Sequence, residues 1–85
     1  MVVEYRVCAR PSVPGQGLMV FEMCLDDKGR IVSYVKTPVI PYGDTVDELY
    51  QDYYKIWRAI EDHDVIDLDR LDAKLEILRN SNGRL

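Results

Sequence analysis

Residues 18–36 read LMVFEMCLDDKGRIVSYVK, the pattern of two β-strands joined by a tight turn. Both faces of the first strand, 18–25, are mostly apolar, which predicts a central position in a sheet. Gly29 closes the Asp26–Gly29 turn and supplies the positive φ that a type I turn with a bulge requires. The second strand, 30–36, is rich in β-branched and aromatic residues. Because a one-residue slip would invert its faces, the pattern leaves open which face is buried.

Upstream of this hairpin, residues 2–10 alternate apolar and polar side chains and predict another strand. Residues 11–17 are dense in proline and glycine and form a loop. Antiparallel pairing of the first two strands places Cys8 opposite a residue near Met19, and Cys24 opposite one near Val3. The two cysteines then lie ~15 Å apart, beyond the reach of a disulfide, so we expect two reduced thiols.

Downstream of the hairpin, two prolines within residues 37–43 predict that the sheet ends in an extended edge segment. Thr45-Val46-Asp47-Glu48 fits a capping box and predicts a helix over 45–62. Its apolar residues recur at helical spacing, so we expect this stripe to pack on one face of the sheet. The stripe comprises Val46, Leu49, Tyr50, Tyr53, Trp57 and Ile60.

A second helix is predicted over 67–80, with Asp67 or Asp69 as its cap. Its leucines form a narrow stripe that fits either a helix docked on its own domain or one half of a dimer seam. They are Leu68, Leu71, Leu75 and Leu78.

The predicted fold is a single α+β domain over residues 1–85. A three-stranded antiparallel sheet occupies residues 1–36, a main helix packs on one of its faces, and a C-terminal helix follows. A chain of 85 residues buries roughly 60–65% of its unfolded surface, which suffices for one core. The apolar content of 47% is slightly more than such a monomer needs, and it predicts a homodimer.

The charge is unevenly distributed. The chain has a net charge of −4, with +1 on residues 1–40 and −5 on residues 41–85. Clustered Lys and Arg are needed to release counterions from nucleic acid, so the composition argues against nucleic-acid binding. The longest uncharged run, residues 11–21, is too short and too broken to span a membrane. A cytoplasmic location is the expectation.

The acidic stretch 61–72 surrounds His63, the only histidine. An EF-type calcium loop starting at Asp62 would need Gly at its sixth position and Glu at its twelfth, where Asp67 and Ala73 stand. A zinc site would need further ligands from elsewhere. Neither an activated nucleophile nor a phosphate loop is recognisable, so we expect no catalytic residue, metal or cofactor. The alternative is a small enzyme or a ligand- or metal-binding domain that uses His63 and neighbouring carboxylates.

Aromatic residues are the richest remaining signal. Tyr50, Tyr53 and Trp57 are expected to fill the space between helix and sheet. Tyr42 and Tyr54 lie outside or at the edge of that stripe, where tyrosine gives contact area at low entropic cost. The candidate interface residues are Tyr42, Tyr54, Leu71, Leu75 and Leu78. The predicted partners are a second copy of the chain or a small basic protein.

Several motifs resemble a family of small uncharacterised bacterial proteins of β-β-β-α type. They are Glu22, Asp26–Gly29, Pro38-Val39, Gly43–Leu49 and Val65-Ile66-Asp67. This resemblance implies a fold and assigns no activity.

The chain also resembles, more weakly, the N-terminal domain of HicB-type antitoxins, through Gly43, Asp44, Thr45 and Glu48. That family neutralises a small basic RNase toxin and often carries a DNA-binding domain. Residues 68–85 hold only one predicted helix, so no such domain is expected here. The function predicted is a non-enzymatic protein–protein interaction module of antitoxin-like character.

Overall fold

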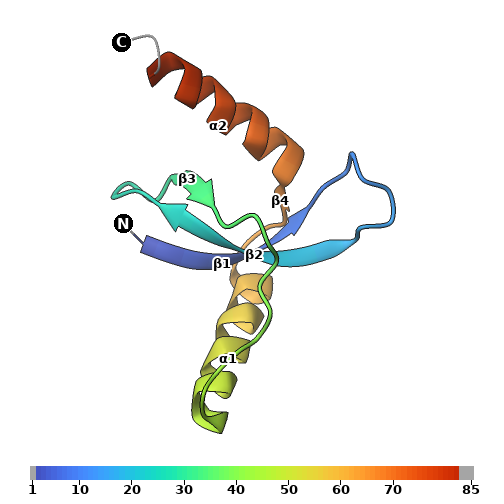
Figure 1. Cartoon of the computed structure of the whole chain (residues 1–85), viewed down its shortest axis with the longest axis vertical. Helices are drawn as coiled ribbons and strands as arrows, with labels where there is room; N and C mark the ends of the chain where they lie inside the picture. The colour runs from blue at the N-terminus through green and yellow to red at the C-terminus, as the bar shows by residue number, and fades with distance from the viewer. Residues whose placement is uncertain (1, 83–85) are drawn as a thin grey trace.

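The computed structural model describes residues 2–82 and forms an α+β fold (Figure 1). The sheet lies between two helices, which project from its opposite faces. The elements are β1 (Val2–Ala9), β2 (Leu18–Leu25), β3 (Ile31–Tyr34), α1 (Val46–Asp62), β4 (Ile66–Asp67) and α2 (Leu68–Asn82). Neither helix within this range is long and apolar enough to cross a membrane.

The two long strands pair antiparallel over their whole length. Cys8 lies opposite Met19 and Val3 lies opposite Cys24, as the sequence predicted. The strand order β3-β2-β1-β4 places β2 inside the sheet, which confirms its predicted central position. Both cysteines are free, as expected from their separation along the ladder.

The prediction of three antiparallel strands is wrong in one respect. Residues 66–67 form a short fourth strand, β4, which pairs parallel with β1 opposite Cys8 and Ala9. The sheet is therefore mixed. Two residues cannot display the period-two alternation by which strands are recognised, so Val65-Ile66 gave only the signal of an apolar anchor.

The β2–β3 turn forms as predicted. The Gly29 amide donates to the Asp26 carbonyl at 3.0 Å, and Gly29 has a φ of 77°. The Asp26 carboxylate accepts from the backbone amides of Lys28 and Arg30. A bulge shifts the register at Cys24 and Leu25 and settles the question left open by the sequence. Tyr34 of β3 is buried in the core, and Ile31 packs against it.

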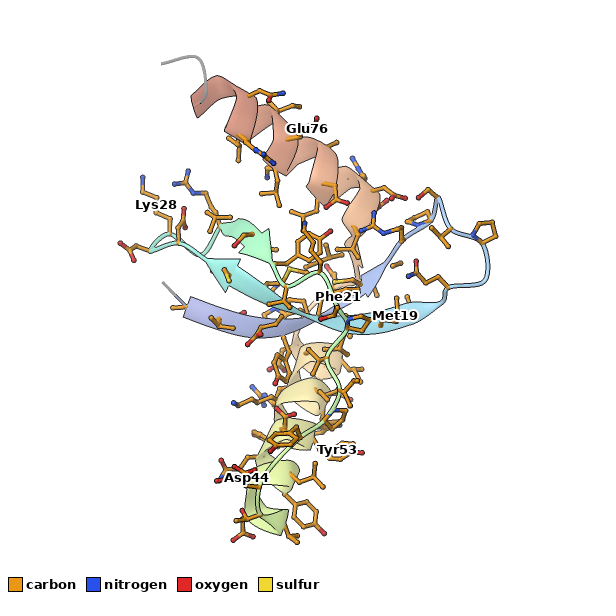
Figure 2. The ribbon with its side chains drawn as sticks, viewed as in Figure 1. Met19, Phe21, Lys28, Asp44, Tyr53 and Glu76 are labelled. Atoms are coloured by element: carbon orange, nitrogen blue, oxygen red, sulfur yellow. The ribbon has the colours of Figure 1, made fainter. Side chains whose placement is uncertain are left out.

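The core lies on the α2 face of the sheet. Its buried members are Cys8, Phe21, Met23, Leu25, Tyr34 and Leu68. Leu71 and Leu75 of α2 pack against this cluster, so the first half of α2 docks on its own chain. The Tyr34 ring meets the Phe21 ring edge-on at 5.9 Å between centroids. Figure 2 shows Phe21 and Met19 at the middle of the molecule, where β2 crosses β1.

The start of α1 is a modified capping box. The Thr45 hydroxyl accepts from the Glu48 amide at 3.1 Å, as predicted. The Glu48 carboxylate reaches past Thr45 and accepts from the Asp44 amide at 2.8 Å. Gly43 lies so close to the helix that a Cβ there would stand 2.3 Å from the Leu49 backbone nitrogen. The glycine is needed for this close approach of two backbones.

The apolar stripe of α1 does not pack on the sheet, contrary to the sequence prediction. The buried residue of α1 is Ala59, whereas the large apolar residues of the stripe remain partly or largely exposed. α1 approaches β1 through the side that carries Ala59 and Asp52. Helical periodicity identifies which face is apolar, but it does not identify what covers that face.

Substituting Gly43 tests the close approach at the start of α1. We expect Gly43→Ala to lower the free energy of unfolding by about 1–3 kcal/mol, because the added methyl overlaps backbone that cannot rotate away. Thr37→Ala, in the same extended segment but exposed, should change it by less than about 0.5 kcal/mol. Urea denaturation followed by circular dichroism measures both. Equal effects would contradict the role of Gly43.

The two thiols should differ in reactivity. Burial raises the pKa of the Cys8 thiol to about 11, so this group stays protonated at neutral pH, whereas Cys24 is only partly buried. In a limited reaction with iodoacetamide at pH 8, mass spectrometry of peptides should find Cys24 modified well before Cys8. In urea both should react alike. Faster modification of Cys8 in the native protein would contradict its burial.

Candidate functional site

Among the residues that the structure describes, α1 carries an aromatic face formed by Tyr50, Tyr53, Tyr54 and Trp57. Their exposed fractions are 71%, 54%, 56% and 52%. The Tyr54 and Trp57 rings lie 5.9 Å apart, tilted by 41°. Together with Gln51 and Lys55 the four rings line a shallow groove. In Figure 2, Tyr53 lies on the part of α1 that extends away from the sheet.

Aliphatic residues extend this surface along the helix. Val46, Leu49 and Ile60 share the side of α1 that carries Tyr53 and are also exposed. The helix has 17 residues and is about 25 Å long. An apolar surface along its whole length is unusual for a soluble monomer and is typical of an interaction site.

α1 is held on its opposite side by one carboxylate. Asp52 accepts from the Tyr5 hydroxyl of β1 at 2.6 Å, and its second oxygen accepts from the Tyr42 amide at 2.9 Å. The hydrogen bond from the Tyr5 hydroxyl to Asp52, together with partial burial, raises the pKa of Tyr5 to about 12. Ala59 is 3% exposed, and its small side chain allows the helix to approach β1 closely. Asp52 therefore fixes α1 with its aromatic face outward.

The predicted interface residues fall in different places. Tyr54 belongs to the aromatic face of α1. Tyr42 is exposed in the segment before α1, and its hydroxyl donates to Asp44. Leu71 and Leu75 contact the core of their own chain, which reduces what they can offer to a partner. Leu78 lies further along α2 and is half exposed.

Three residues of the aromatic face were assigned to the core by sequence reasoning: Tyr50, Tyr53 and Trp57. A second periodic set, Asp52, Ile56 and Ala59, marks the side of the helix that faces the rest of the chain. Ala59 was the signal that could have identified this side, because a helix that lies close to a sheet favours alanine at the contact. The larger aromatic residues masked that signal.

His63 lies at the end of α1, beside a hollow of about 390 Å³ between β1 and α1. The lining includes charges of both signs, and its ionisable residues are Glu4, Tyr5, Glu22, Tyr54, Lys55, Arg58, Asp62 and His63. Its volume is at the lower end of the range for small-molecule sites. Within the part of the chain that the structure describes, no group of three His, Cys, Asp or Glu side chains is placed to hold a metal.

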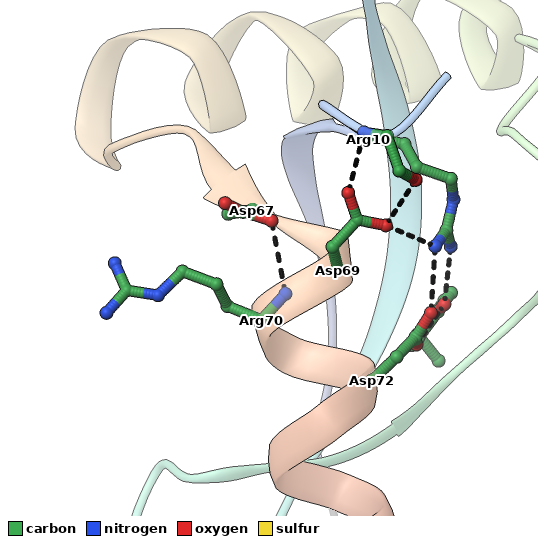
Figure 3. Close-up of polar contacts among 7 residues, drawn as sticks. Arg10, Asp67, Asp69, Arg70 and Asp72 are labelled. Atoms are coloured by element: carbon green, nitrogen blue, oxygen red, sulfur yellow. Dashed lines mark hydrogen bonds and ion pairs between the residues drawn. The ribbon is translucent and has the colours of Figure 1, made fainter.

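Three of the acids that follow His63, Asp67, Asp69 and Asp72, have structural roles (Figure 3). Asp67 caps α2 by accepting from the Arg70 amide at 3.1 Å, which confirms one of the two predicted caps. Asp69 and Asp72 both pair with Arg10, at 3.1 and 2.9 Å. Asp69 also accepts from the amide and hydroxyl of Ser12. These contacts join the β1–β2 loop to the start of α2.

The Arg10 network extends to the core through one hydroxyl. The Tyr34 hydroxyl donates to Asp72 at 2.6 Å and accepts from Arg10 at 3.1 Å. Partial burial and the hydrogen bond to Asp72 raise the pKa of Tyr34, while Arg10 opposes the rise. The neutral hydroxyl is therefore the form in which Tyr34 bridges the two charged groups.

This network should make the docking of α2 sensitive to acid. The Ser12 amide and the Arg10 guanidinium hold the pKa of Asp69 below its ordinary 3.8, so Asp69 stabilises the fold at neutral pH. That contribution is lost as the pH falls below about 4. Asp69→Asn should lower the melting temperature at pH 7 and reduce its fall between pH 5 and 3, measured by circular dichroism. Asp27→Asn, in the hairpin turn, is the control; identical pH profiles for all three proteins would contradict the assignment.

No protein-family model, no curated protein and no solved structure matches this chain.

Proposed function

We propose that this chain is a non-enzymatic protein–protein interaction module that binds through the aromatic face of α1. The observation that carries the proposal is the exposure of four neighbouring aromatic side chains on one side of one helix. Tyrosine and tryptophan are enriched in binding hot spots, because they bury a large area with few rotatable bonds. A monomer that left this surface in water would gain nothing from its apolar side chains.

The way α1 is anchored supports the same proposal. Asp52 and Ala59 hold the helix from behind, so the aromatic face is presented without need for rearrangement. Binding to a prearranged surface costs less conformational entropy than binding to a mobile one. The chain thus resembles a preformed docking surface more than an enzyme, whose chemistry needs an enclosed site.

The antitoxin-like version of this proposal takes a small basic protein as the partner. Acidic side chains flank the aromatic face near both ends of α1, at Asp47 in the first turn and at Glu61. Opposite charge at the rim of an interface speeds association and selects partners. Such a partner would be recognised by aromatic contacts at the centre and by acids at the rim.

The hollow beside His63 supports a second candidate function, the binding of a small polar ligand. Charges of both signs and two tyrosines, Tyr5 and Tyr54, line it. Such a site would give chemical-shift changes at His63 and Tyr5 when a ligand library is screened by NMR. Changes at Tyr53 and Trp57 alone would speak against it.

A photo-reactive amino acid tests the principal proposal. Benzoylphenylalanine in place of Tyr53, irradiated in intact cells, should give a discrete adduct that contains a second polypeptide. The same residue in place of Lys28, at the exposed hairpin turn, is the matched control and should give none. Mass spectrometry identifies the cross-linked chain. Equal cross-linking at the two positions, or none at either, would overturn the proposal.

A further inference from the structure

We infer that the aromatic face of α1 binds the same face of a second copy of this chain, with the two α1 helices antiparallel about a two-fold axis. This inference rests on the proposed function and names the partner. It is carried by the area of the surface and by the position of the charges beside it.

The exposed area is the right size for a dimer. Each of the four rings is exposed by half or more, which corresponds to roughly 100 Å² of ring surface apiece. Val46, Leu49 and Ile60 bring the apolar surface to on the order of 600 Å² per chain. Two such faces in contact bury on the order of 1,200 Å², where stable and specific interfaces begin. A standard dimer therefore needs little beyond the surface already exposed.

Among the charges on one flank of the aromatic face, Asp47 and Arg58 are complementary across an antiparallel dimer, and Glu61 is the acid on that flank without a basic counterpart there. With 3.6 residues per turn, Asp47 and Arg58 lie on the same flank of the apolar stripe, one near each end of the helix. A two-fold axis turns each flank toward the identical flank of the other copy. If the axis passes between Tyr53 and Tyr54, the centre of the aromatic face, Asp47 lies level with Arg58 of the second copy to within about one turn. Both pairs then form at once.

A parallel arrangement would lose this complementarity. A parallel two-fold pair turns each flank toward the opposite flank of the other copy, so Asp47 and Arg58 neither face each other nor lie at the same level along the helices. Within one chain Arg58 pairs with Asp62 at 2.6 Å, and both side chains are substantially exposed. An exposed pair of this kind contributes little to stability, so Arg58 can turn to a second partner at small cost.

The placement of α1 makes the face accessible. Figure 1 shows the helix projecting away from the sheet, with α2 on the far side of the sheet. An antiparallel pair puts the two sheets at opposite ends of the helix pair rather than side by side. The core formed with α2 is left undisturbed, so the dimer needs no rearrangement of either monomer.

Sedimentation equilibrium of the full chain from 1 to 200 µM measures the association. The expected mass is twice the 9.9 kDa of one chain. Tyr50→Ser combined with Trp57→Ser should give a monomer, and circular dichroism shows whether this variant folds. A monomeric wild-type chain at 200 µM would overturn the inference. If photo-cross-linking from position 53 still captured another protein, the proposed function would stand.

A charge exchange tests the antiparallel geometry. Asp47→Arg and Arg58→Asp should each raise the dimer dissociation constant about tenfold, because each creates like-charged pairs at both symmetric contacts. The double variant should return to within about threefold of the wild type, since the pairs are restored with reversed sign. Lys28→Asp is the matched control for a change of charge and should leave the constant unchanged. Additive weakening in the double variant would exclude this arrangement.

Leu78→Ser tests the competing interface. Leu78 is half exposed on α2 and belongs to the leucine stripe that could form a dimer seam. The proposed pairing predicts that Leu78→Ser leaves the dimer dissociation constant unchanged. A dimer that is broken by Leu78→Ser and retained by the Tyr50 and Trp57 substitutions would overturn the assignment to α1.

Discussion

The hydrogen bonds of one carboxylate fix which side of α1 faces the sheet and which side faces water. Asp52 joins α1 to β1 through the Tyr5 hydroxyl and to the preceding segment through the Tyr42 amide. Because Asp52 lies on the same side of the helix as Ala59, this side is the one drawn toward the sheet. The larger aromatic stripe is left on the outside. A polar contact has thus overridden the apolar preference that would normally orient an amphipathic helix.

This orientation has an energetic cost that a partner can remove. Each large apolar side chain left in water forgoes roughly 1.5–3 kcal/mol relative to full burial. A domain of this size has only about 5–15 kcal/mol of net stability, so four exposed rings are a substantial fraction of it. On the other face of the sheet, Leu68, Leu71 and Leu75 of α2 pack against the core, and Ile77 and Leu78 further along α2 remain exposed. The exposed aromatic side chains that lie next to one another are those of α1.

Local patterns in the sequence predicted the local structure well. The β2–β3 hairpin, the pairing of Cys8 with Met19, the Thr45 cap and the Asp67 cap all follow from interactions within a few residues or along one ladder. The strand β4 was not predicted, because two residues are too few to show the alternation that identifies a strand. The side to which the aromatic face points was predicted wrongly, because it depends on a hydrogen bond between Asp52 and Tyr5, which are 47 positions apart. Periodicity contains no information about such a contact.

The exposed aromatic face of α1 also bears on how the stability of this chain depends on protein concentration. If the aromatic face is buried only between two molecules, folding and association are linked, and the apparent stability rises with protein concentration. The Arg10 network acts on the other side of the sheet and does not involve α1, so it stabilises the docking of α2 at any concentration. The protein is then divided into a part that is complete within one chain and a helix whose apolar surface is completed by another. Substitutions at Asp69 should act independently of concentration, whereas those at Tyr50 or Trp57 should act through it.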